Sequence, residues 1–113
     1  MPDTASGRNA PWTLGEIRVI VDIYFEMLEY ELSSANYVKA GYNREIQAKT
    51  GRSRQSVDYK FCNISHVLKE AGYPSIDGYK PRSNTQSALR DVVLKRAAVL
   101  PYLQSFGQDG RRA

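Results

Sequence analysis

Four stretches of the chain carry apolar residues at the three- and four-residue spacing that favours an α-helix. The first begins after Thr13 and ends near Leu32, and "TLGE" at its start is typical of a capping box closed by Thr13 and Glu16. The apolar positions that define its period are Ile17, Ile20, Val21, Tyr24 and Leu28. Because several of their neighbours are apolar too, we expect this helix to be largely enclosed, with its glutamates at the solvent edge.

A second helix is expected over about residues 39–49, and Gly51 just beyond it is a typical helix stop. Ser53 is a typical N-cap for the third helix, which we expect to end near Ala71. The turn between these two helices, residues 50–53, is tight. Two helices joined in this way have the arrangement of a helix-turn-helix.

The segment 73–83 contains two prolines and a glycine, which predicts a loop. Ser83 or Asn84 is expected to cap the last long helix, which ends or kinks at Pro101, and residues 102–106 are expected to add one packed turn. The predicted fold is therefore all-α, a small domain of four to five helices. It contains a helix-turn-helix-like pair, followed by a basic loop before the last helix.

The totals favour one soluble domain. The chain has 113 residues, no apolar run of the length a bilayer requires, and no apolar core of a secretory signal near its start. Its one cysteine cannot form an internal disulfide or complete a zinc site, so we expect neither metal nor cofactor. We expect a domain over residues 12–106, a disordered tail over 1–11, a basic tail over 107–113, and a cytoplasmic location.

Charge is divided unevenly along the chain. The net charge is +4, but residues 13–36 hold one base and five acids, whereas residues 37–113 hold fourteen bases and six acids. An acidic helix beside a basic remainder indicates a basic face for nucleic acid, although an incidental surface asymmetry would give the same totals.

The third helix has two contrasting faces. A helical wheel places four apolar residues on one narrow arc: Val57, Phe61, Ile64 and Leu68. The opposite side carries amides, hydroxyls, a thiol and an imidazole: Gln55, Ser56, Tyr59, Cys62, Asn63 and His66. Solvated helix faces are usually rich in long charged residues, whereas amides and hydroxyls distinguish the donors and acceptors of base edges in a major groove. This pattern predicts a DNA-recognition helix, near which Lys60 flanks the core and extends outward.

The N-terminal residues of a recognition helix reach deepest into the groove. The best base-edge candidates are accordingly Arg52, Arg54, Gln55 and Tyr59. Ser53 and the free N–H groups of the first turn are candidates for holding a phosphate. Structural roles for these residues are alternative interpretations. Arg54 and Asp58 are spaced as an i,i+4 salt bridge, and Tyr59 is placed to pack on the following loop. Asn63 and His66 are suited to capping that loop.

Two further segments are candidate phosphate contacts. On the second helix these are Lys39, Asn43 and Arg44, because the first helix of such a motif crosses the DNA backbone. In "GYKPRSN" they are Lys80, Arg82 and Asn84, because Pro81 stiffens a basic loop beside a helix start. Alternatively, the segment 78–84 is a solvated loop that makes no contact with DNA.

Four blocks of the chain resemble a known family. "WTLGEI", "YVKAGYNREI", "GRSRQSVDYKFCNISHVL" and "IDGYKPRSN" are similar to the N-terminal DNA-binding domain of McrA-type HNH restriction endonucleases, over about residues 12–100. The resemblance implies a reader of 5-methylcytosine in double-stranded DNA. An HNH nuclease needs at least two histidines, and this chain has only His66, so we expect binding without cleavage.

Reading a methylated cytosine requires a wall against the methyl group in the major groove. One arginine can hold the adjacent guanine while its guanidinium plane packs on the methyl; Arg52 or Arg54 is the candidate, with Tyr59 or Tyr42 as second wall. Flipping the base into an aromatic pocket is the alternative.

Other functions remain open at this point. A modification-blind transcriptional regulator would have the same helix pair, and the acidic first helix with "VLPYLQSF" would suit a protein-interaction or dimer face. The sequence does not fix the oligomeric state. An enzyme is the weakest hypothesis, because the i,i+4 pair of Cys62 and His66 has no credible catalytic neighbour.

Overall fold

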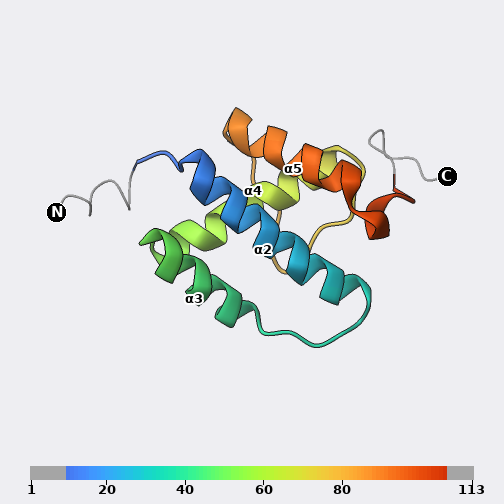
Figure 1. Ribbon diagram of the computed structural model, residues 1–113, viewed down its shortest axis with the longest axis horizontal. Helices are drawn as coiled ribbons and strands as arrows, with labels where there is room; N and C mark the ends of the chain where they lie inside the picture. The colour runs from blue at the N-terminus through green and yellow to red at the C-terminus, as the bar shows by residue number, and fades with distance from the viewer. Residues whose placement is uncertain (1–9, 107–113) are drawn as a thin grey trace.

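In the computed structural model of the protein, the described residues are 10–106 (Figure 1). Its elements are α2 (Leu14–Leu32), α3 (Lys39–Thr50), α4 (Arg54–Glu70), α5 (Ser87–Val99) and a 3₁₀ turn, η1 (Pro101–Leu103). The expected all-α fold is confirmed. Most of the predicted tails, residues 1–9 and 107–113, lie outside the described residues.

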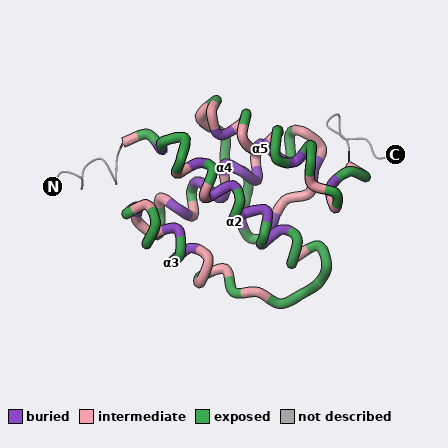
Figure 2. Tube along the Cα trace, in the orientation of Figure 1, coloured by how far each residue is buried: buried purple, intermediate pink, exposed green. Residues whose placement is uncertain are grey.

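Two helices form the centre of the domain. α2 and α4 each pack against all three other helices, and α4 crosses behind α2 in the view of Figure 1. Both carry buried residues along most of their length, as Figure 2 shows in purple. α3 and α5 cover opposite sides of this pair and bury far fewer residues. The expectation that the first helix is largely enclosed is therefore confirmed.

The predicted helix starts of α2 and α4 are also confirmed. Thr13 Oγ1 accepts a hydrogen bond from the Glu16 N–H, and Glu16 Oε1 accepts one from the Thr13 N–H. Ser53 Oγ accepts a hydrogen bond from the Ser56 N–H at the start of α4. Between α3 and α4, Gly51 has a φ of 75°, a left-handed conformation that favours glycine, so the chain turns tightly there.

A buried tyrosine ties the long loop to the core. The Tyr24 hydroxyl shares a 2.7 Å hydrogen bond with Ser65 Oγ and accepts another from the Ile76 N–H at 2.9 Å. Its polar atom is therefore satisfied inside the core, as a buried hydroxyl requires. Tyr79, farther along the same loop, packs on Phe61 of α4 with ring centroids 4.9 Å apart. The loop is thus fixed against α2 and α4 at two points.

The start of the last helix differs from the prediction. Gln86, rather than Ser83 or Asn84, is the N-cap of α5, and Asn84 instead has a left-handed φ of 67°. Gln86 makes no capping bond because its side chain bonds elsewhere, to the Trp12 carbonyl and Lys60. At the other end, Pro101 ends α5 as expected.

The packed turn expected beyond α5 is present. Leu103 is buried, and the Tyr102 hydroxyl donates a 2.8 Å hydrogen bond to the Phe25 carbonyl of α2. Among the helices of the described chain, none has the length and apolar character needed to cross a membrane.

Candidate nucleic-acid interface

Arg52 was predicted to read bases, and the structure corrects its placement. It is only 4% exposed. Its guanidinium donates to the carbonyls of Ala10 and Pro11 at 2.6 and 3.0 Å and to Glu16 Oε1 at 2.7 Å, and it lies 4.8 Å from the Trp12 ring centroid. The side chain therefore fastens the start of α2 to the α3–α4 turn. It is not available to DNA in this conformation.

Lys60 belongs to the same cluster and is corrected in the same way. It does not extend outward: it is 8% exposed, its Nζ donates to Gln86 Oε1 at 2.9 Å, and it lies 5.4 Å from the Trp12 centroid. Burial, followed by repulsion from Arg52, lowers the pKa of Lys60. The sequence pattern did not single out Trp12; its position just before the capping box was the available signal.

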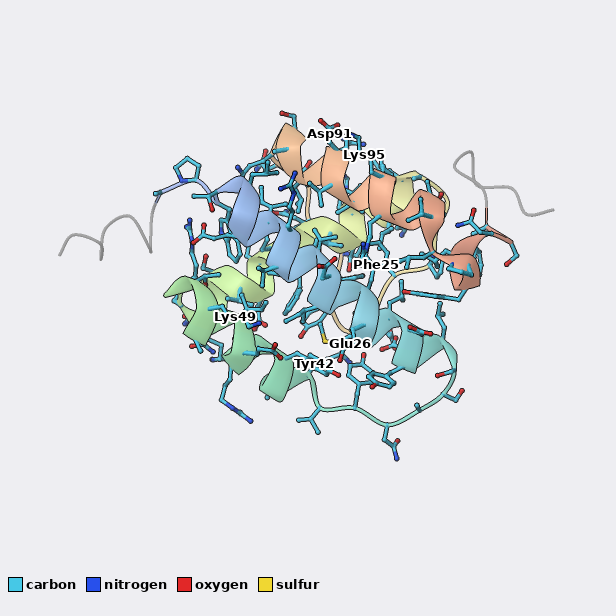
Figure 3. All side chains as sticks on the ribbon, in the orientation of Figure 1. Phe25, Glu26, Tyr42, Lys49, Asp91 and Lys95 are labelled. Carbon is cyan, nitrogen blue, oxygen red and sulfur yellow. The ribbon has the colours of Figure 1, made fainter. Side chains whose placement is uncertain are left out.

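Asn43 on α3 is also engaged within the protein. It is 3% exposed, and its Nδ2 donates to Asp58 Oδ1 at 2.7 Å and to the Arg54 carbonyl at 3.3 Å, which joins α3 to α4. Tyr42 points toward α2, where its hydroxyl donates to Glu26 Oε2 at 2.9 Å (Figure 3). Neither the predicted phosphate contact of Asn43 nor the predicted methyl-reading role of Tyr42 fits these positions.

The second half of the polar face of α4 is covered by the basic loop. Asn63, 1% exposed, donates to the carbonyls of Arg82 and Ser83 at 2.7 and 3.0 Å, and the Arg82 N–H donates to the Cys62 carbonyl at 3.1 Å. Burial raises the pKa of the Cys62 thiol, which Arg82 partly opposes. For Asn63 the structure favours the alternative in which it holds the loop, so Asn63 is not a base contact here.

His66 lies beyond the covered segment and faces Glu70, with 3.5 Å between its Nε2 and Glu70 Oε1. The polar face is thus free only over its first two turns. There Arg54, Gln55 and Tyr59 are exposed, while Ser53 and Ser56 are half-buried and bonded to each other. These turns are the part of a recognition helix that enters a groove.

Basic side chains from three segments surround these turns. A groove between α3 and α4, called here the basic groove, is lined by Lys39, Ala40, Asn43, Arg44, Gln47, Arg54, Asp58 and Tyr79. Arg44 and Arg54 are exposed on its two sides. Beyond Tyr79, the loop adds Lys80 and Arg82, both exposed. Asn84 is exposed on the same loop.

Three of the residues predicted to contact DNA have partners within the protein, which limits their availability to DNA. Arg54 Nη1 lies 3.9 Å from Asp58 Oδ2, so the expected i,i+4 pair is present, although its arginine remains largely solvent-accessible. Lys39 Nζ lies 4.0 Å from Glu31 and over the rings of Tyr37 and Tyr79. The Arg82 guanidinium lies 5.5 Å from the Tyr59 ring centroid, which brings loop and helix together.

The sequence pattern did not single out Tyr79. Tyr79 forms one wall of the basic groove, and burial together with Asp58 raises its pKa to about 12. Its hydroxyl therefore stays protonated at physiological pH and can donate a hydrogen bond. Within residues 10–106, no group of three or more histidine, cysteine or carboxylate side chains is placed to hold a metal ion.

Comparisons of the chain with protein-family models, with curated proteins and with solved structures give no match.

Proposed function

We propose that this domain binds double-stranded DNA through the first two turns of α4. The observation that supports this most directly is that exposed cations from three segments lie at these turns: Arg44 and Arg54 line the basic groove, and the Arg82 guanidinium lies 5.5 Å from the Tyr59 ring centroid. Lys80, exposed on the loop two residues before Arg82, is a fourth candidate cation. Asp58 is the one carboxylate that lines the basic groove; Asn43 donates a hydrogen bond to it, and Arg54 partly neutralises its charge. A phosphate backbone needs cations spaced along its length in this manner.

The chemistry of the exposed turns suits base reading better than simple charge attraction. Gln55 has an amide that can pair with adenine, and Tyr59 presents an exposed ring in front of the Arg82 guanidinium. With Arg52 buried, Arg82 is the better candidate to hold a guanine through its O6 and N7 atoms. The methyl of a neighbouring 5-methylcytosine would then pack against Tyr59.

We further propose that the modified base is 5-methylcytosine. The support is the resemblance of four sequence blocks to methylcytosine-reading domains, together with the arginine–tyrosine pair just described. Reading in the groove is favoured over flipping, because Tyr59 stands on an exposed helix surface. The protein would act in the cytoplasm at the nucleoid, without cofactor and without cleaving DNA.

A titration with one short duplex in unmethylated, hemimethylated and fully methylated forms tests this function. We expect affinity to rise with each methyl, and a single buried methyl contributes about 1 kcal/mol, or roughly fivefold. Equal binding to all three duplexes would instead identify a modification-blind regulator. Failure to bind any of them at low salt would overturn the proposal and favour a protein-interaction module.

Three variants separate the roles of the residues. Tyr59→Ala should lower the ratio of methylated to unmethylated affinity, and Arg82→Ala should weaken binding where guanine follows the modified base. Lys95→Ala is the control, since Lys95 is exposed on α5, away from the proposed surface (Figure 3). An equal loss in all three variants would contradict the proposed site.

A further inference from the structure

A second groove lies on the other side of α3, between α2 and α3. It is called here the tyrosine groove and is lined by Glu26, Tyr30, Asn36, Tyr37, Val38, Gly41, Tyr42 and Glu45. Three of these side chains are tyrosines and two are carboxylates, and its lining includes no lysine or arginine. This composition is the opposite of that of the basic groove, although both grooves share α3 as a wall.

The three rings form one connected cluster. Tyr30 stacks on Tyr37 with centroids 6.3 Å apart, and Tyr37 meets Tyr42 edge to face at the same distance. The Tyr37 hydroxyl donates to Glu31, and the Tyr42 hydroxyl donates to Glu26. Burial and Glu26 raise the pKa of Tyr42 to about 12, so the Tyr42 hydroxyl stays neutral at physiological pH.

The charge and the rings together favour a cationic occupant. Aromatic faces attract ammonium and guanidinium groups, and carboxylates at the rim add to the attraction. One ring already takes part in such a contact: Lys39 Nζ lies 5.3 Å from the Tyr37 centroid. A phosphate backbone would meet Glu26 and Glu45 here and be repelled. Exposed apolar surface on Val38, 66% exposed, and on Tyr30 suits a peptide rather than a small ion.

We propose that the tyrosine groove binds a lysine-rich segment of a partner protein, with a lysine ammonium against the tyrosine rings. The proposal does not depend on DNA binding, because the two grooves lie on opposite sides of α3. It assigns α3 to two surfaces at once, one for an anionic ligand and one for a cationic ligand.

The test is fluorescence anisotropy with a labelled octalysine peptide and the whole protein, with DNA absent. Tyr30→Leu removes one ring while keeping an apolar side chain, and Glu45→Gln removes one charge from the rim. Each should weaken binding at least threefold. Asp91→Asn is the matched control, because it removes the same charge from an exposed site on α5, far from Glu26 and Tyr42 in Figure 3.

Three results would overturn the proposal: no binding of the peptide, unchanged binding by Tyr30→Leu, or an equal loss in Asp91→Asn and Glu45→Gln. An equal loss in these two variants would mean that the peptide is attracted to negative charge anywhere on the protein and not to this groove. An octalysine peptide trimethylated on every Nε gives an independent check of the rings. Because aromatic faces attract the charge without needing N–H donors, this peptide should bind at least as tightly as octalysine. If the trimethylated peptide did not bind, the attraction would come from salt bridges to the carboxylates and not from the rings. Circular dichroism of each variant confirms that it is folded.

Discussion

Two arginines, Arg52 and Arg54, lie two residues apart and have opposite environments. The Arg52 side chain is 2% exposed and bonded to three oxygen atoms, whereas the Arg54 side chain is 69% exposed. The sequence showed two equivalent basic residues at the start of a helix. It did not show which one meets Trp12, because that partner lies forty positions earlier and only the tertiary fold brings it near.

The difference between the two arginines predicts different costs of removal. Arg52→Ala should lower the free energy of unfolding by about 2–4 kcal/mol, because it leaves Glu16 and two carbonyls without their charged donor. Arg54→Ala is the matched control and should change it by about 0.5 kcal/mol or less, as expected for an exposed pair. Urea unfolding followed by circular dichroism measures both. Similar values for the two variants would contradict the structural role assigned to Arg52.

Glu16 adds a pH dependence at the same place. Burial alone would raise the pKa of Glu16, but the hydrogen bonds from Arg52 and the Thr13 backbone, with the charge of Arg52, lower it below 4.5. The ionised carboxylate therefore stabilises the fold above pH 4.5, and this contribution is lost as pH falls through the lowered pKa. Glu16→Gln should have a lower free energy of unfolding than the wild type at neutral pH, and this difference should shrink in acid. Urea unfolding across this range checks it, and a deficit independent of pH would contradict it.

At the scale of elements, local sequence signals predicted most helix boundaries correctly. They did not predict a boundary that is set by contacts with residues far away in the sequence. The capping box, Gly51 and Pro101 act within one turn of the chain, so their effects were readable in the sequence. The start of α5 was not, because Asn63 of α4 holds the carbonyls that precede it and Gln86 bonds to Trp12 and Lys60. The same contacts explain why half of the predicted recognition face is covered.

Asn63 should therefore control the order of the basic loop. Asn63→Ala removes two buried donors to the loop and should lower the free energy of unfolding by about 1–3 kcal/mol. Hydrogen exchange should also speed up at the Arg82 N–H, which bonds to the Cys62 carbonyl, while the amides of α2 keep their protection. Gln55→Ala, at an exposed position of the same helix, is the control and should change neither quantity. Unchanged exchange at Arg82 would show that Asn63 does not hold the loop.

At the scale of the whole molecule, α3 separates surfaces of opposite charge. Lys39, Arg44 and Arg54 line the basic groove, whereas Glu26 and Glu45 line the tyrosine groove. The sequence indicated this division only coarsely, as an acidic first helix and a basic remainder. It could not show that the two signs meet at one helix, because the face that each residue of α3 presents depends on how that helix packs between α2 and α4.

This arrangement predicts how DNA binding should respond to salt. If Arg44, Arg54 and Lys80 each neutralise one phosphate, the logarithm of affinity should fall against the logarithm of salt concentration with a slope of about −3. Arg44→Ala should weaken binding to methylated and unmethylated duplexes equally and reduce the slope by about 1, because Arg44 is proposed to contact the backbone alone.

Arg82→Ala should act differently. Because Arg82 is proposed to hold a guanine, Arg82→Ala should lower the preference for duplexes with a guanine after the modified cytosine more than it alters the salt slope. Lys95→Ala should leave both the preference and the slope unchanged. Titrations at four salt concentrations with each variant measure these slopes. A slope that falls equally for Arg44→Ala and Lys95→Ala would mean that net charge, and not this surface, attracts the DNA. A slope that falls for Arg82→Ala while the preference for guanine is unchanged would place Arg82 on a phosphate and leave the reading of the methyl to Tyr59.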